Sequence, residues 1–507
     1  MIQQLLLPLA SISKSLLLTL ILLLSLYLAD IHRVSASTLP DIGNSAELLM
    51  SPEDEKRIGI EFMRQVRYQL KLEEDVSSNE YIQQLGNKLA SQIDTRGQTF
   101  TFFIISDPSI NAFAGPGGFI GIHTGLILSS KSEGELASVI AHEIAHVVQR
   151  HLLRSMESSK NMTLATFGAI LAAMILGGEV GEAVFASTLA GSAQSQLSYS
   201  RAHEQEADRV GIEMLARAKY NPNDMPNFFE TLDRQTRFAQ HNIPELLLTH
   251  PVTSSRIADT RARADLLAKT YIENLDGELS GNTTTTSASQ FELIQARLDI
   301  LSQKMGIPTE KSSLIIPEKA ENRKTNHLKL YKVALTHFNK GEHDKARSKL
   351  KLLIEEEPSR IAYLSAAAEN EIADSKFSAA INLLKEPLLT YPNNLTLTLL
   401  TAEAMILNKN PQSARNLLLE LIRSGNYTPE SYKLLAKAEK QSGRESEAYE
   451  AMGNYYYTLR EFNSAINHFE QALEKNVSDN FRELQLKARI SQLKAELLKM
   501  RTGQQGQ

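Results

Sequence analysis

The sequence predicts a mainly α-helical protein with one small β-sheet, followed by an α-solenoid, a stack of paired helices. Most of the chain has the i, i+3, i+4 spacing of apolar residues that is typical of amphipathic helices. Two segments, 99–105 and 119–125, have the composition that favours strands. Toward the C-terminus, alanines recur at a fixed interval of 34 residues, which is typical of stacked helix pairs.

The N-terminal segment predicts export. After Lys14, residues 16–29 form a nearly unbroken apolar run, and the small residues of Val34-Ser35-Ala36 suit a signal-peptidase site. We therefore expect residues 1–36 to be a signal peptide that is cut after Ala36, which delivers the chain to a bacterial periplasm. A retained transmembrane anchor is the alternative, because the run is only slightly short of a membrane span.

Length, charge and cysteine content narrow the class of protein. The 507-residue chain is too long for one hydrophobic core, so two or more domains are expected. Lys and Arg number 54 against 59 Asp and Glu, a net charge of −5, which provides no basic surface for nucleic acid. With no cysteine, the chain can form neither a disulfide bond nor a lipoprotein anchor.

Two helices are predicted at the start of the mature chain. Ser51-Pro52 is typical of a helix start, and apolar residues recur with helical spacing from Ile58 to Leu70. A second helix is expected from Tyr81 to Ile93.

The two predicted strands, 99–105 and 119–125, are separated by an expected turn at 111–118. Glycines in and around the second strand indicate that another backbone approaches closely. We interpret this strand as an edge that a substrate peptide could join, with an ordinary glycine-rich hairpin as the alternative. The residues of this predicted edge are Gly117, Gly118, Phe119, Ile120 and Gly121.

The segment 139–148 has helical periodicity and contains the pattern HExxH, from His142 to His146. Residues four apart lie above one another on a helix, so the two imidazoles can share a metal ion. Glu143 lies on the flank of that face, where a carboxylate can hold a water molecule and act as general base.

A catalytic zinc site needs a third protein ligand and one open position. Downstream, Glu204 and Asp208 lie one turn apart on one helix face. Glu204 can complete a His2Glu site, while Asp208 can accept the outer N–H of a ligating imidazole. Glu206 points to a different face and is less favoured, and we interpret His203 as a helix-surface histidine.

Residues 161–200, between the two ligand helices, are apolar, rich in small residues and broken by Gly177-Gly178. Three interpretations remain open: a mobile helical lid or plug beside the cleft, a segment that makes peripheral contact with a membrane, and a buried helical hairpin.

Three patterns together resemble the M48 family of zinc metallopeptidases over roughly residues 48–270. They are His142-Glu143-xx-His146, Glu204-xxx-Asp208 and the turn Asn111-Ala112-Phe113-Ala114-x-Pro116-Gly117-Gly118. The resemblance implies a zincin-like (gluzincin) domain with one Zn²⁺ per chain, in which His142, His146 and Glu204 are ligands and Glu143 is the base. The integral-membrane relatives carry several spans that this chain lacks, which points to the exported branch.

The resemblance also implies a regulatory role for His250. In periplasmic members with a helical-repeat tail, the histidine of a His-Pro loop can occupy the open position of the zinc, which makes the enzyme latent. Spacing alone would make His250 a turn residue before a helix. Arg256 follows, and it could either steady a developing oxyanion or form a structural ion pair.

The C-terminal part is repetitive. Ala346, Ala380, Ala414 and Ala448 recur at an interval of 34, the tetratricopeptide period. The best match to the repeat consensus, at 452–472, is out of phase with Ala448 by 17 residues, so one extra helix, half a repeat, is expected. The concave face of such a solenoid typically binds proteins.

The expected organisation is a signal peptide (1–36), a peptidase domain (37–272), a linker with one helix at 291–303 (273–325), a repeat domain (326–500) and a disordered tail (501–507). The predicted function is an exported, periplasmic zinc endopeptidase that acts on extended or misfolded segments, and the resemblance implies that its substrates are misfolded or stalled outer-membrane β-barrel proteins. The resemblance implies docking of the repeats on the outer-membrane assembly machinery and its unfolded clients. The alternative is a chaperone or adaptor that acts through its repeats, with proteolysis secondary.

Overall fold

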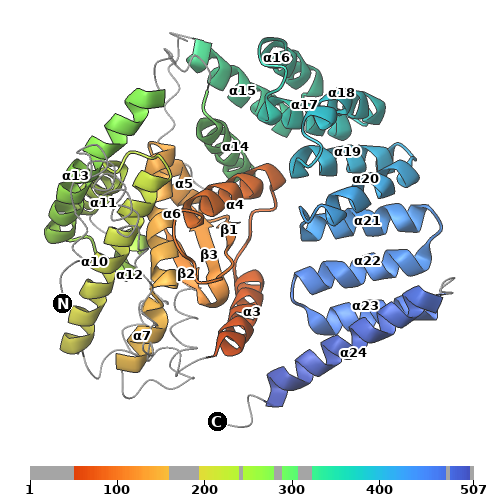
Figure 1. Ribbon diagram of the computed structural model, residues 1–507. Helices are drawn as coiled ribbons and strands as arrows, with labels where there is room; N and C mark the ends of the chain where they lie inside the picture. The colour runs from red at the N-terminus through yellow and green to blue at the C-terminus, as the bar shows by residue number, and fades with distance from the viewer. Residues whose placement is uncertain are drawn as a thin grey trace, which may run out of the picture. The chain divides into compact units, whose positions relative to one another are not determined.

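The protein is described here by a computed structural model that covers residues 51–158, 193–238, 244–278, 288–306, 323–475 and 480–502 (Figure 1). As predicted, it is mainly helical with a small sheet, followed by paired helices. The predicted signal peptide, most of the segment 161–200 and the end of the predicted tail lie outside the described residues. Among the helices that are described, none is both long and apolar enough to cross a bilayer.

The first two helices are close to those predicted. α3 (Pro52–Gln69) starts after Ser51, whose hydroxyl accepts a backbone N–H of the first turn. α4 (Val76–Ala90) starts earlier than the predicted Tyr81, because Asp75 caps its first turn in the same way.

The sheet has the strand order β1-β3-β2. β1 (Thr101–Ile105) is parallel to β3 (Phe119–His123), and β2 (Ala112–Gly115) is antiparallel to β3. β2 lies inside the predicted turn, of which only Pro116–Gly118 is a short helical turn. Its small residues have weak strand propensity, so the pairing with β3 decides its conformation.

The predicted substrate edge is wrong, because β3 is the middle strand and is paired on both sides. Of the five residues, Phe119, Ile120 and Gly121 lie in β3, and Gly117 and Gly118 form the turn before it. The glycines serve packing within the chain. A Cβ on Gly118, where φ is +78°, would lie 2.2 Å from the Thr99 carbonyl oxygen, and one on Gly121 would lie 2.8 Å from the Phe113 ring. Within the described sheet, β2 is the edge strand beside the candidate site.

The helix α6 (Glu133–Val148) is nearly fully buried. Besides α6, the described helices between the sheet and residue 278 are α5 (Thr124–Ser129), α7 (His151–Ser158), α10 (Ala193–Arg217), α11 (Asp224–Phe238), α12 (Glu245–Thr249) and α13 (Ser254–Glu278). α6 packs on α4, α7, α10 and α11, and further helices contribute to the same part of the fold. α10 crosses α6 at close range: a Cβ on Gly211 of α10 would lie 3.3 Å from the backbone nitrogen of His142.

The helix predicted in the linker is α14 (Gln290–Lys304), and it is buried on two sides. One side packs in the core around α6, and the other packs in the first core of the repeats. The residues of the two sides are Phe291, Ile294 and Leu298, and Leu293, Ala296 and Ile300, respectively. α14 therefore joins the two cores rather than serving as a spacer.

Paired helices stack beyond α14 (Figure 1). Their bounds are α15 (Arg323–Asn339), α16 (His343–Glu356), α17 (Ile361–Ala373), α18 (Phe377–Thr390), α19 (Leu395–Leu407), α20 (Pro411–Arg423), α21 (Pro429–Gln441), α22 (Glu445–Thr458), α23 (Phe462–Glu474) and α24 (Asn480–Thr502). The four alanines of the 34-residue period lie in α16, α18, α20 and α22, and all are buried at helix crossings.

The turns between paired helices repeat with the same period. A residue with positive φ stands at Gly341, Ser375, Lys409 and Gly443, and the next, Arg460, follows only 17 residues later. This left-handed residue ends each helix by a tight backbone turn. α22 therefore closes one pair and opens the next, as the half-repeat offset predicted.

The repeat helices contact the N-terminal helices directly, and the described residues from 51 onward belong to one compact unit. Thr396 of α19 donates a hydrogen bond of 2.6 Å to Glu80 of α4. Arg297 of α14 binds Asp75 at 2.5 Å and Glu369 of α17 at 2.7 Å. Part of the repeat surface is therefore occupied by the chain's own helices, which narrows the surface left for partners.

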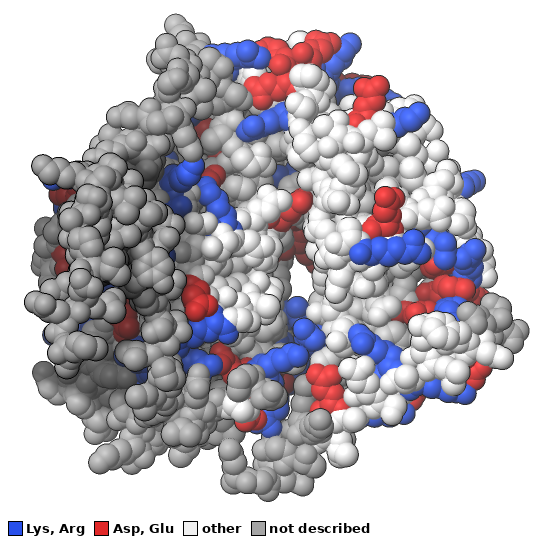
Figure 2. Space-filling view, in the orientation of Figure 1, with Lys and Arg blue, Asp and Glu red and all other residues white. Residues whose placement is uncertain are grey.

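Figure 2 shows basic and acidic side chains interspersed over the repeat helices on the face that it draws. Several of them pair, including Lys376 with Asp374 at 2.8 Å and Arg482 with Glu450 at 2.7 Å. Exposed pairs of this kind contribute little to stability, in contrast to the Arg297 cluster, where the Arg297 and Asp75 side chains are each 8% exposed.

Replacing Arg297 by leucine should lower the free energy of unfolding by about 3–5 kcal/mol, because Asp75 and Glu369 then lose their buried cation. Denaturant unfolding of the mature protein measures the change. The matched control is Arg263→Leu, which breaks an exposed pair with Asp259 and should cost about 1 kcal/mol or less. Equally small losses of unfolding free energy in the two variants would contradict the conclusion that Arg297 stabilises the fold by pairing with Asp75 and Glu369.

Candidate active site

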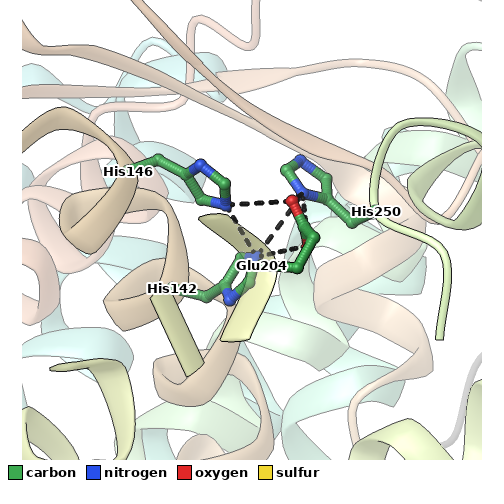
Figure 3. Close-up of side chains that lie close together, drawn as sticks. All are labelled: His142, His146, Glu204 and His250. Carbon is green, nitrogen blue, oxygen red and sulfur yellow. Dashed lines mark hydrogen bonds and ion pairs between the residues drawn. The ribbon is translucent and has the colours of Figure 1, made fainter. Parts of the chain in front are cut away.

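Four side chains from separate parts of the chain meet at one point (Figure 3). His142 and His146 come from α6, Glu204 from α10 and His250 from the residue that ends α12. One nitrogen or oxygen of each lies within 4.8 Å of those of the others. The two histidines lie one turn apart on α6, and the close crossing at Gly211 brings α10 onto the same face.

The separations between these atoms fit a bound metal ion. His142 Nε2 lies 3.0 Å from His146 Nε2, 3.3 Å from a Glu204 oxygen and 3.4 Å from His250 Nδ1. Zinc bonds of about 2.0–2.1 Å in a tetrahedron place the donor atoms about 3.3 Å apart. The donor set and its spacing therefore fit a four-coordinate metal, and His250 stands where a fourth ligand would be.

Asp208 and Arg256 support this cluster from behind. Asp208 lies 3.0 Å from His142 Nδ1, the outer nitrogen, but the contact does not have the angles of a hydrogen bond. Arg256 donates to both Asp208 oxygens at 2.8 and 2.7 Å, and lies 3.0 Å from Glu204. Its third nitrogen also donates to the carbonyl of Pro251. Because all three guanidinium nitrogens are engaged, the geometry favours the ion-pair alternative for Arg256 over the oxyanion role.

The charges around the cluster keep its carboxylates ionised. Burial alone would raise the pKa of Glu204, but His250 and His146 lower it well below its usual value. Burial likewise opposes ionisation of Asp208, whose pKa Arg256 and His142 lower. Burial opposes protonation of His142, but Asp208 and Glu204 outweigh it and raise its pKa to about 9. The two carboxylates therefore favour a positive charge at His142, which a bound metal ion would supply in place of the proton.

Glu143 faces the cluster from the side of α6. It is 1% exposed, and among the described residues its Oε1 accepts no hydrogen bond. His250 Nε2 lies 3.5 Å from this oxygen. A buried carboxylate oxygen without a donor beside a metal site is suited to hold a water molecule.

Two histidines lie behind His146. His203 is placed differently from the prediction, and His151 was not predicted. His203 is buried and stacks on His151, with ring centroids 4.2 Å apart, so the helix-surface interpretation is wrong. His151 was not predicted as a site residue, yet its Nδ1 lies 3.0 Å from His146 Nδ1. The signal for it is the cluster of three histidines between residues 142 and 151. Glu206 lies away from the metal ligands and pairs with His151 and Arg154.

Comparison with known proteins agrees with this geometry. Residues 77–264 match the description "Peptidase family M48". The chain is 34% identical over 467 residues to the beta-barrel assembly-enhancing protease of Escherichia coli (strain K12), which covers 91% of this chain and 92% of that protein. For the Yersinia pestis protein of the same name the identity is 30% over 460 residues, covering 90% and 91%. Identity to the mitochondrial metalloendopeptidase OMA1 of Arabidopsis thaliana is 28% over 227 residues, 44% of either chain.

These matches, added to the donor cluster on α6 and α10, define the class of protein as a metal-dependent endopeptidase with a zincin-like domain and a tetratricopeptide-type solenoid. The chain belongs to peptidase family M48. The similarity extends through the repeats, because it spans about nine-tenths of the sequence, 91% for the Escherichia coli protein.

Proposed function

We propose that this protein is a periplasmic zinc endopeptidase that degrades misfolded or stalled outer-membrane β-barrel proteins and is held latent by His250. The observation that carries the proposal is the cluster of His142, His146, Glu204 and His250, whose donor atoms have the separations of a tetrahedral site.

Zinc is the metal that this donor set favours. Two or three imidazoles and one carboxylate in four-coordinate geometry suit Zn²⁺, which has no preference for planar or octahedral sites. His142, His146 and Glu204 would hold the ion, and Asp208 would fix the orientation of His142. When bound, the ion lowers the pKa of a water molecule and polarises the scissile carbonyl.

Glu143 is the residue that moves the proton. Its buried oxygen without a donor can take a proton from the attacking water and deliver it to the leaving amine. A glutamine at this position would keep the shape but could not accept the proton.

His250 excludes that water as long as its loop stays in place. Its Nδ1 lies 3.0 Å from Glu204 Oε1 and 3.4 Å from His142 Nε2, which supports His250 as the fourth ligand. α12, the short helix that leads into this loop, is held at its start, where Leu246 N donates to the Ile110 carbonyl at 3.1 Å and Asn111 donates to Glu245 at 3.1 Å. Activity therefore requires the loop to leave.

We expect a substrate peptide to pair with the free edge of β2, next to the point where Leu246 bonds to Ile110. His123 N bonds to Asn111 O, so by antiparallel alternation the backbone N–H and C=O of Ala112 and Ala114 point away from β3. Among the described residues, no partner is recorded for these groups. An extended peptide that pairs with β2 competes with the loop, which already uses Ile110. This favours unfolded segments as substrates, because a folded protein offers no free strand.

The clients and the location rest on the relatives and on the N-terminal sequence. The similar proteins are named beta-barrel assembly-enhancing proteases, which supports misassembled outer-membrane proteins as substrates and the outer-membrane assembly machinery as the partner of the repeats. The apolar run at 16–29 followed by Val34-Ser35-Ala36 supports export.

The His250→Ala variant should cleave casein at least tenfold faster than the wild type, because the fourth position becomes open to water. The rate of casein cleavage by the purified mature proteins measures this. An unchanged or lower rate at full zinc content would contradict latency by His250.

The matched control is His250→Ala combined with Glu143→Gln, which should retain zinc and lose cleavage by a factor of 10² or more, roughly what a general base contributes. Glu143→Gln alone separates the enzyme from an adaptor. If outer-membrane assembly survives this change in full while deletion of residues 326–500 abolishes it, the chaperone or adaptor alternative holds.

In the His250→Ala background, Ala114→Pro should slow casein cleavage about tenfold or more and leave the melting temperature nearly unchanged. Proline removes only the N–H that points away from β3, so the peptide loses a pairing site while the sheet keeps its own. Ala114→Val keeps the N–H and is the control. Full activity of the proline variant would exclude pairing at β2.

Export predicts that the protein recovered from the periplasm begins at Ser37. Mass spectrometry of the intact protein gives the position of its N-terminus. A chain that still carries residues 1–36 and fractionates with the inner membrane would instead support the anchor alternative.

A further inference from the structure

His151 lies directly behind His146, on the side away from the metal ligands. α6 ends at Val148, Arg150 adopts a φ of 52°, and α7 begins at His151. This sharp turn points the His151 ring back at α6, where its Nδ1 lies 3.0 Å from His146 Nδ1. The ring is 3% exposed, so solvent does not compete for this contact.

We propose that His151 is a positioning residue that fixes the tautomer and the orientation of His146. The inference rests on the proposed function, in which His146 binds the metal through Nε2. Nothing in the HExxH pattern itself assigns this role, because the pattern specifies the ligands and not what stands behind them.

The positions of the protons make the chain of contacts self-consistent. A neutral imidazole that uses Nε2 for the metal carries its proton on Nδ1, so His146 must donate and His151 Nδ1 must accept. His151 then carries its own proton on Nε2, which lies 3.2 Å from the Glu206 carboxylate. Each nitrogen thus has one role, and the chain ends on an anion that can accept.

Neighbouring groups hold this chain in place. His203 stacks on His151 with an angle of 10° between the ring planes. Arg154 donates to Glu206 at 2.9 Å and fixes its carboxylate. The two ligands of α6 are therefore supported differently: Asp208 faces His142 directly, whereas Glu206 reaches His146 only through a second imidazole.

Two substitutions separate positioning from packing. In His151→Asn, the amide oxygen replaces Nδ1 as the acceptor but the ring is lost. In His151→Phe, the ring and its stacking on His203 remain but the acceptor is lost. A role in packing alone ranks phenylalanine above asparagine, and a positioning role ranks them in the opposite order.

Zinc affinity, measured by competition with a chelator on the purified mature proteins, should fall about 10–100-fold in His151→Phe. In His151→Asn it should stay within a few-fold of the wild type. With Co²⁺ in place of zinc, the visible absorption spectrum should change in the phenylalanine variant and be retained in the asparagine variant. Thermal melting in the presence of a chelator checks that both variants fold.

The control is His327→Phe, which alters a fully buried histidine of the repeats and should leave zinc affinity unchanged. Loss of affinity in His151→Asn with retention in His151→Phe overturns the inference, and so does an equal result in the two variants. A wild-type protein that binds no stoichiometric zinc would instead overturn the proposed ligand set.

Discussion

The close crossing of α6 and α10 is the constraint on which the active site depends. Gly211 of α10 has no side chain where it faces the α6 backbone, and an added Cβ would lie 3.3 Å from His142 N. Glu204 and Asp208 can therefore reach different nitrogens of one imidazole, Nε2 and Nδ1 of His142. A Cβ at 211 would press on the α6 backbone at His142 N, so a side chain at this position would disturb the helix that carries the histidine.

The site also depends on a balance of buried charge. Among the described residues, Glu143, Glu204 and Asp208 place three carboxylates in the interior beside the buried Arg256. Arg256 and the raised pKa of His142 both offset this negative charge, because unpaired buried charge is costly. A bound cation would take the place of the His142 proton, so the charge of the site and the spacing of its donor atoms both favour a metal ion.

The features that sequence could predict are those set by local periodicity. The four-residue spacing of His142 and His146, the matching pair on α10 and the 34-residue alanine period all follow from helical geometry. The features that sequence could not predict depend on contacts between distant segments. β2 is a strand because β3 pairs with it, and His203 is buried because α7 covers it. α14 was predicted as part of a linker because polar segments flank it in the sequence. Only the structure shows that its two sides are buried in two different cores.

The burial of α14 in both cores also bears on how a protein that binds to the repeats would reach the candidate active site. A flexible tether lets a bound chain search many orientations, whereas a helix embedded at both sides removes that freedom. If a substrate protein bound to the repeat helices, as proposed above, only its peptide bonds at a set distance from the repeats could enter the candidate active site. The place where a client is held, more than the identity of the residues around the bond, would decide where it is cut.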